Sequence, residues 1–238
     1  MTKSSVQTLL FDLDGTLIKL DMNTFLPHYF RALGSYFAHL IEPKTLAHHI
    51  LASTDVMINN LDPALTNQEV FMADFLPRLG RPEGEILSIF DDFYTHEFPR
   101  LGSSEVTSEA ACQAVELAMA RGFEVIIATN PVFPMQAIRH RLDWGGLGGY
   151  NFKLVTAYER MHFCKPHIQY YREVLELLGR NPEECWMVGN DMEEDMVAAK
   201  VGIRTFLVED FLIDRGKTRL APVARGRITD LPDFVASL

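Results

Sequence analysis

The second half of the chain repeats one pattern, in which an amphipathic helical segment is followed by a short, strand-like apolar run. The expected helices from about residue 103 onward are 106–122, 134–142, 165–179 and 193–202. The strand-like runs that follow them are 123–129, 152–157, 185–189 and 203–208. Such an alternation indicates a parallel sheet with helices on both faces. The sequence therefore predicts a doubly wound, Rossmann-like α/β fold.

The first half departs from this pattern. An apolar run at residues 6–12 is expected to be the first strand of the sheet. It is followed by four helical segments without a convincing strand, at 23–41, 43–60, 66–80 and 82–98. Thr66 followed by Glu69 is the pattern of a capping box at the start of the third segment. We therefore expect two domains, namely an α/β core of residues 1–17 and 103–238 and an all-helical cap of residues 18–102.

Composition limits the partners of the chain. Its 238 residues carry a formal net charge of -10, which repels a polyphosphate backbone, so no nucleic acid partner is expected. The arginines of residues 214–227 are interpreted as part of a solvated loop. No apolar run could span a bilayer, the N-terminal residues lack the features of a signal peptide, and three cysteines without a CxxC pair suit a reducing compartment. We therefore expect no membrane partner and a cytoplasmic location, and the sequence does not indicate an oligomeric state.

Polar side chains follow the predicted strands at the points where these strands end. In chain order they are Asp12, Asp14, Thr129, Asn130, Lys165, Asn190, Asp191 and Asp195. Lys165 is expected to open the helix after the third strand. Because ligands of an open parallel sheet bind beyond the carboxyl ends of its strands, these groups should converge on one crevice.

The order of these motifs resembles that of a known family. The stretch FDLDGTL at residues 11–17 is followed by a threonine after an apolar strand, then a Lys-Pro step, then an acidic pair after Val-Gly. This order resembles the haloacid dehalogenase (HAD) superfamily of phosphohydrolases, and the resemblance covers nearly the whole chain. The helical insertion resembles the first class of cap in that superfamily. The resemblance implies a Mg²⁺-dependent phosphatase.

The resemblance also implies roles for the two aspartates. Asp12 would attack phosphorus to form an aspartyl-phosphate and would give one carboxylate oxygen to Mg²⁺. Asp14 would give the metal its backbone carbonyl, which leaves its side chain free to protonate the leaving oxygen and later to accept a proton from water. Dehalogenases, phosphonatases and cation pumps of the superfamily carry another residue at this position. Asp14 therefore implies an oxygen leaving group.

Four further residues are candidates for binding the phosphoryl group. Thr129 and Lys165 would hold it, with the lysine also bridging to Asp12. Gly15 would allow a tight turn whose backbone N–H groups could bind phosphate oxygens, and Asn130 is a further substrate-binding candidate.

The fourth motif differs from that of many relatives, which have Gly-Asp at the strand end. Here the sequence is Gly189-Asn190-Asp191. We favour Asp191 as the metal ligand and Asp195 as a supporting carboxylate on the lysine, with Asn190 as the alternative ligand.

Other polar and aromatic residues are assigned structural roles. Glu193 and Glu194 are interpreted as an acidic first turn of the next helix. Aromatic residues of the predicted cap are expected mostly in its core, with one or two at the substrate cavity; they include Phe25, Tyr29, Phe30, Tyr36 and Phe37.

The sequence supports one function most strongly and leaves two alternatives open. The favoured function is hydrolysis of a small phosphorylated metabolite, such as a sugar phosphate, phosphoglycolate or a nucleotide. A phosphomutase of the same family would need the same catalytic residues. A protein that binds such a metabolite without turnover is supported only by the departure at Asn190.

Overall fold

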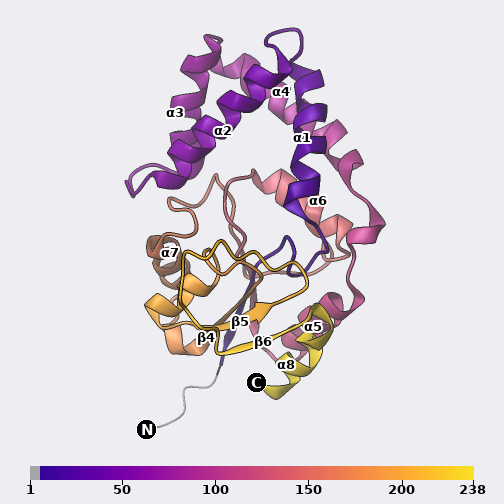
Figure 1. Cartoon of the computed structure of the whole chain (residues 1–238), viewed down its shortest axis with the longest axis vertical. Helices are drawn as coiled ribbons and strands as arrows, with labels where there is room; N and C mark the ends of the chain where they lie inside the picture. Colours follow the sequence, from indigo (N-terminus) through magenta and orange to yellow (C-terminus); the bar gives the residue numbers. More distant parts are fainter. Residues whose placement is uncertain (1–5) are drawn as a thin grey trace.

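The computed structural model describes residues 6–238, which fold around a six-stranded sheet (Figure 1). The strands are β1 (Thr8–Phe11), β2 (Glu124–Ile127), β3 (Leu154–Val155), β4 (Cys185–Gly189), β5 (Arg204–Val208) and β6 (Ala224–Gly226). Their order is β3-β2-β1-β4-β5-β6, and each neighbouring pair is parallel. The predicted doubly wound α/β fold is confirmed.

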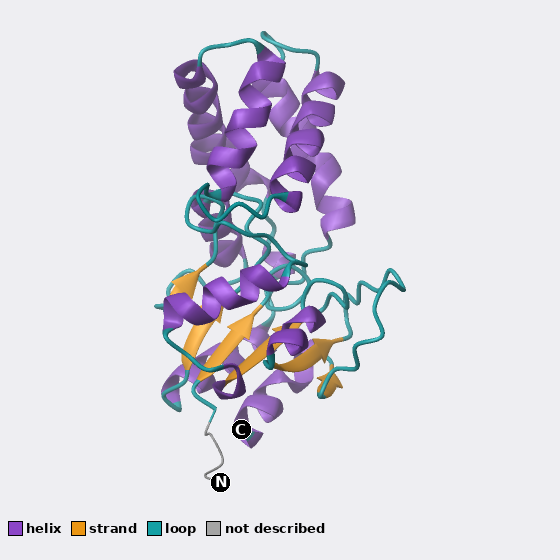
Figure 2. Ribbon diagram, turned by 90° about the vertical axis from the view of Figure 1, so that its left-hand side faces the viewer, coloured by secondary structure: helices purple, strands orange, loops and turns teal. Residues whose placement is uncertain are grey.

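Successive residues of β1 face opposite sides of the sheet, as the pleat of a strand requires. Leu9 and Phe11 belong to an apolar cluster with residues of α5 (Glu109–Ala120), α6 (Met135–Trp144) and α8 (Leu231–Ser237). Leu10 belongs to a second cluster with residues of α7 (Ile168–Leu178). Helices thus cover both faces of the sheet (Figure 2), which is why every residue of β1 and β4 is buried.

Four helices separate β1 from α5. They are α1 (Met22–Phe37), α2 (Pro43–Asn59), α3 (Asn67–Leu79) and α4 (Glu83–Asp92). The chain leaves α4 through a π-helical turn at Phe93–Glu97 and a 3₁₀ turn at Phe98–Leu101. Figure 1 shows these helices as a layer above the carboxyl ends of the strands. Among residues 6–238, no helix combines the length and the apolar character that crossing a membrane requires.

The division into a core and a cap with boundaries at 17/18 and 102/103 stays a prediction, and residues 1–5 of the expected core segment lie outside the described part. The start of α3 shows how the helical layer is attached to the sheet layer. Thr66 and Glu69 form the predicted capping box, in which each side chain accepts the backbone N–H of the other residue. The N–H of Asn67 then donates to the carbonyl of Met161 at 2.7 Å, and its side-chain amide donates to that of Pro131 at 3.3 Å. Both carbonyls belong to loops of the sheet layer.

Three segments differ from their predicted structure. Part of the expected loop 214–227 forms β6, whose short Ala-Arg-Gly sequence has no apolar alternation that would reveal a strand. Residues 196–201 form a 3₁₀ helix where an α-helix was expected. Helix α7 begins at Ile168 and not at Lys165, because the residue before Ile168 still has extended backbone angles.

Candidate active site

The carboxyl ends of β1, β2 and β4 meet around a cavity of about 210 Å³. Because β1 lies between the other two strands, the residues that follow all three are neighbours in space. Seven of the predicted polar residues line this cavity: Asp12, Asp14, Thr129, Asn130, Asn190, Asp191 and Asp195. The eighth, Lys165, contacts two of their carboxylates.

Asp12 and Asp195 share the buried ammonium group of Lys165. Nζ of Lys165 donates to Oδ1 of Asp12 at 3.0 Å and to Oδ1 of Asp195 at 2.6 Å, and the lysine is only 1% exposed. Burial raises the pKa of Asp12 to about 6 and that of Asp195 to about 7, against the opposing effect of the lysine. Burial alone would lower the pKa of Lys165, but the two carboxylates raise it well above its usual value. The lysine therefore stays charged and fixes one oxygen of Asp12.

The other oxygen of Asp12 is less constrained. It accepts a long hydrogen bond from the hydroxyl of Thr16, at 3.5 Å from Oδ2. The same hydroxyl donates to Oδ1 of Asn190 at 3.1 Å. Oδ2 of Asp12 and Oδ1 of Asn190 thus approach a common point beside the cavity.

Asp14 is paired with an arginine that sequence reasoning did not identify. Nη1 of Arg141, on α6, donates to Oδ2 of Asp14, and its guanidinium group stacks over the ring of Phe133 at 4.6 Å. Arg141 is 1% exposed, and within residues 6–238 its Nη2 atom has no hydrogen-bond partner. The other oxygen of Asp14 is also buried and without a partner in this part of the chain. Burial raises the pKa of Asp14, and Arg141 opposes this shift.

Asn190 and Asp191 have different hydrogen-bond partners. Nδ2 of Asn190 donates to the carbonyl of Phe211 at 2.7 Å, while its Oδ1 faces Thr16. Oδ1 of Asp191 accepts the backbone N–H groups of the two following glutamates at 2.8 and 2.9 Å. Both oxygens of Asp191 also accept hydrogen bonds from Arg215, at 2.9 and 2.7 Å. The carboxylate of Asp191 is therefore already well supplied with donors.

The four predicted phosphoryl-binding residues occupy different parts of the site. The carbonyl of Thr129 accepts hydrogen bonds from Thr156 and Tyr170, which fix this residue two positions after the end of β2. Asn130 accepts the backbone N–H of Lys165 at 3.2 Å and donates to its carbonyl at 3.4 Å, so this amide holds the lysine segment in place.

Gly15 forms the expected tight turn, with a φ of +77°, and a Cβ atom there would lie 2.5 Å from Nδ2 of Asn190. However, the N–H of Gly15 donates to the carbonyl of Ile18 at 2.8 Å within the turn itself. Gly15 therefore serves the site through its conformation and its lack of a side chain, because its N–H already has a partner.

Three charged residues of the cavity were missed or given other roles by sequence reasoning. Arg141 could have been found from the sequence, because it shares the buried face of its helix with Ala137 and Leu142. A charged residue on such a face requires a buried partner. Arg215 carried no such signal, since it reaches Asp191 from a surface loop. Glu194, which was interpreted as part of the acidic first turn of a helix, lines the cavity, and burial raises its pKa to about 7.

The oxygen atoms of the site fit a hard cation such as Mg²⁺. Among residues 6–238, no three His, Cys, Asp or Glu side chains are grouped as a metal site. The set implied by the resemblance does not need such a group, because it combines the Asp12 carboxylate with a backbone carbonyl and one side-chain oxygen from Asn190 or Asp191. The loosely held Oδ2 of Asp12 is compatible with this set.

Comparison with known proteins places the chain among hydrolases. The model of the haloacid dehalogenase-like hydrolase family matches residues 6–202. The pyrophosphatase PpaX of Bacillus pumilus is 24% identical over 205 residues, which are 86% of this chain and 84% of that protein.

Solved structures share the fold over almost the whole chain. The HAD hydrolase YfnB of Bacillus subtilis, bound to magnesium, superposes with a TM-score of 0.58 and 18% identity over 97% of this chain and 99% of its own. The L-2-haloacid dehalogenase of Xanthobacter autotrophicus gives a TM-score of 0.58 and 17% identity over 98% of this chain and 99% of its own. At these identities the structures establish the fold alone.

Proposed function

Because this chain belongs to the haloacid dehalogenase-like hydrolase family, we propose that it is a Mg²⁺-dependent phosphatase of a small phosphomonoester. One observation carries the proposal. The cavity places Asp12, with one oxygen fixed by Lys165, beside a second carboxylate, Asp14, that has an oxygen without a protein partner among the described residues. This arrangement supplies a nucleophile and a proton donor to the same small volume.

In the first step Asp12 attacks phosphorus. One carboxylate oxygen of Asp12 forms a bond to phosphorus while the ester P–O bond breaks, and the leaving oxygen takes a proton from Asp14. In the second step Asp14 accepts a proton from a water molecule that attacks the phosphorus of the aspartyl-phosphate. Inorganic phosphate leaves, and the carboxylate of Asp12 and the proton on Asp14 are restored.

The side chains around the two aspartates hold the reacting group. The ammonium of Lys165 and the hydroxyl of Thr129 would bind phosphoryl oxygens, and Asp195 keeps the lysine in place. Arg141 orients Asp14 through one oxygen and leaves the other for proton transfer. When Mg²⁺ is bound, it neutralises negative charge on the phosphoryl oxygens, so that one anion can approach another.

Asp12, the carbonyl of Asp14 and one residue of the fourth motif would hold the metal. The contacts support Asn190 for the third position, because its Oδ1 atom shares the hydroxyl of Thr16 with Asp12. Asp191, which the sequence favoured, would have to give up its contacts with Arg215.

Phosphate release tests the proposed activity. A panel of small phosphomonoesters and pyrophosphate is incubated with wild type and Asp12→Asn, each with Mg²⁺ and with a chelator. We expect release from at least one monoester that requires Mg²⁺ and is lost in the variant. Isomerisation of a sugar phosphate with little free phosphate would show a mutase, and release that is unchanged in Asp12→Asn would refute the assigned nucleophile.

A further inference from the structure

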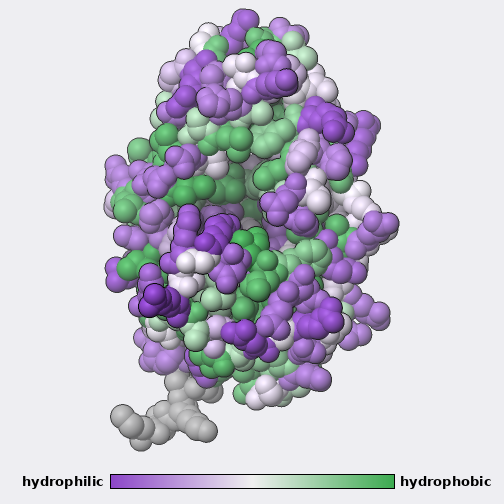
Figure 3. Space-filling view, viewed as in Figure 1, coloured by the Kyte–Doolittle hydropathy of each residue, from purple (hydrophilic) through white to green (hydrophobic). Residues whose placement is uncertain are grey.

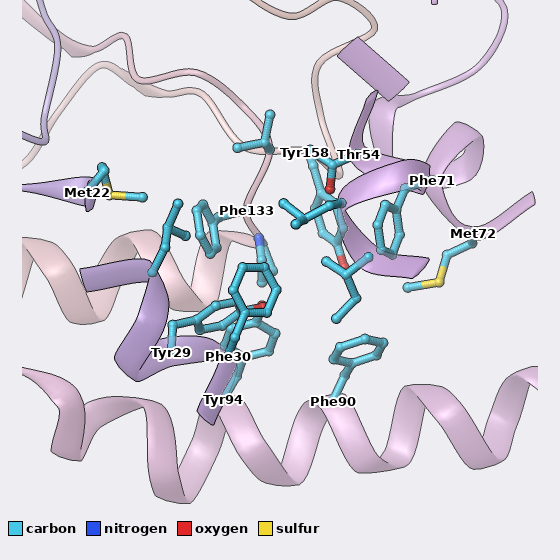
Figure 4. A pocket seen from close by; sticks show the side chains of 15 residues that line it. Met22, Tyr29, Phe30, Thr54, Phe71, Met72, Phe90, Tyr94, Phe133 and Tyr158 are labelled. Atoms are coloured by element: carbon cyan, nitrogen blue, oxygen red, sulfur yellow. The ribbon is translucent and has the colours of Figure 1, made fainter. Parts of the chain in front are cut away.

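A second cavity, of about 160 Å³, lies between the helical layer and the sheet layer (Figure 4). Its lining comes from α1 to α4, from the π-helical turn after α4 and from the loops that follow β2 and β3. Figure 3 shows apolar residues gathered in the hollow between the upper and lower parts of the molecule. We call this space the apolar pocket.

The chemistry of the apolar pocket is uniform. None of its fifteen lining residues is charged, and seven are aromatic. Apart from Thr54, their only polar side-chain groups are the hydroxyls of three tyrosines. Two of these, on Tyr29 and Tyr94, hydrogen-bond each other at 2.9 Å. A carboxylate or a second phosphate in this space would have no cationic partner, and its desolvation would be uncompensated.

The apolar pocket adjoins the candidate active site. Met22, Val132 and Phe133 line both cavities. Phe133 lies four residues after Thr129, and its ring contacts Arg141 on one side and Tyr29, at 5.6 Å between ring centroids, on another. The loop that would hold the phosphoryl group therefore continues directly into the wall of the pocket. An ester whose phosphorus lies beside Asp12 can extend its alcohol side along Phe133.

The volume of the pocket limits the size of that alcohol. An engineered apolar cavity of about 150 Å³ in another protein binds benzene. A cavity of about 160 Å³ that is rich in aromatic side chains therefore accommodates a group of about one aromatic ring, packed by edge and face contacts.

We propose that the apolar pocket binds the alcohol side of the substrate, which is a phosphate monoester of an uncharged alcohol carrying an apolar group of about one aromatic ring. This inference rests on the proposed phosphatase function and narrows its substrate class. It disfavours phosphoglycolate, sugar phosphates and pyrophosphate, whose leaving groups are charged or rich in hydroxyls.

Three substrates separate the contribution of the pocket from that of the leaving group. Benzyl phosphate and glycerol phosphate are both esters of ordinary alcohols, so they test apolar binding without chemical activation. The 4-carboxybenzyl ester keeps the ring and adds one charge at its far end. We expect kcat/KM for benzyl phosphate to exceed that for glycerol phosphate by about 10-fold or more. The kcat/KM for the 4-carboxybenzyl ester should be lower than that for benzyl phosphate by on the order of 100-fold, because of the added carboxylate.

A variant of the pocket should change this preference. Thr54 is half-buried on α2 and lines the pocket. Thr54→Arg therefore places a cation beside the aromatic ring of a bound benzyl ester. The ratio of kcat/KM for the 4-carboxybenzyl ester to that for benzyl phosphate should rise by about 10-fold or more. Val56→Arg is the matched control, because Val56 lies on the same helix but is 42% exposed and outside the pocket. It should leave the ratio unchanged.

Binding measurements on Asp12→Asn keep this inference separate from the proposed activity. Calorimetric titration with benzyl phosphate and with its 4-carboxy analogue gives affinities that do not depend on turnover. If Asp12→Asn binds benzyl phosphate selectively but the wild-type protein releases phosphate from no substrate, the role of the pocket is supported and the phosphatase activity is refuted. If the wild-type protein releases phosphate in a metal-dependent way but prefers glycerol phosphate, phosphoglycolate or pyrophosphate, the phosphatase activity is supported and the proposed role of the pocket is refuted. Equal affinity for the two benzyl esters would also refute it.

Discussion

Asp14 is held by Arg141, a side chain that lies 127 residues later in the chain. Both groups are largely removed from water, at 12% and 1% exposure of their side chains. A buried ion pair contributes little net stability, but the loss of one partner leaves the other charge uncompensated. Asp14 is therefore oriented correctly only when α6, which carries Arg141, is correctly placed.

We predict that Arg141→Met lowers the free energy of unfolding by about 3–5 kcal/mol, because it leaves the carboxylate of Asp14 buried without its partner. Methionine keeps much of the packing against Phe133. The free energies are measured by urea denaturation. Adding Asp14→Asn should recover part of the loss, since the uncompensated charge is then removed. If the losses in free energy of unfolding of the two single variants simply add in the double variant, the coupling between Arg141 and Asp14 is contradicted.

A second prediction at the residue scale concerns the metal. Asn190→Ala should raise the Mg²⁺ concentration needed for half activity more than Asp191→Ala does, because Oδ1 of Asn190 lies on the side of Asp12. Activity is titrated with Mg²⁺ at a saturating substrate concentration. Arg215→Met serves as the control, since it frees the carboxylate of Asp191 without removing either candidate ligand. A larger rise for Asp191→Ala would restore the assignment that the sequence favoured.

Helix α3 shows how a local signal in the sequence positions a larger element. Its capping box closes the first turn, and the following residue, Asn67, ties that turn to loops of the sheet layer. We predict that Thr66→Ala lowers the free energy of unfolding by about 1 kcal/mol, through the loss of the N-terminal cap. Urea denaturation measures this change. Ser35→Ala on an exposed part of α1 should change stability by less than about 0.5 kcal/mol, and an equal loss in both variants would contradict the role of the cap.

Elements whose residues alternate in a regular way could be predicted from the sequence. The first five strands and helices α1 to α7 were expected within a few residues, because buried strands and amphipathic helices leave a periodic apolar pattern, whereas α8 was not predicted. Strand β6 left no such pattern, since its three residues join the sheet through backbone pairing with β5. The 3₁₀ geometry of residues 196–201 is also invisible in a sequence that suits an α-helix equally well.

At the scale of the whole molecule, the candidate site was predictable where its residues follow strands and hidden where they arrive from elsewhere. Asp12, Thr129 and Asn190 follow adjacent strands, so topology alone brings them together. Arg141 and Arg215 come from a helix and a surface loop, and their contacts depend on packing that no local pattern reveals. The apolar pocket likewise forms where the helical layer meets the loops after β2 and β3, which lie far from the cap helices in the sequence.

The central claim is that Asp12 carries the phosphoryl group and Asp14 the proton. Both parts are tested by mixing Asp14→Asn with p-nitrophenyl phosphate and Mg²⁺. This leaving group departs without a proton donor, whereas hydrolysis of the intermediate still needs a base. We expect a rapid burst of about one p-nitrophenolate per enzyme, a slow steady rate, and phosphate on the peptide that contains Asp12 after quenching. The burst should be absent in Asp12→Asn. A burst that persists in Asp12→Asn, or phosphate attached to another residue, would contradict the account.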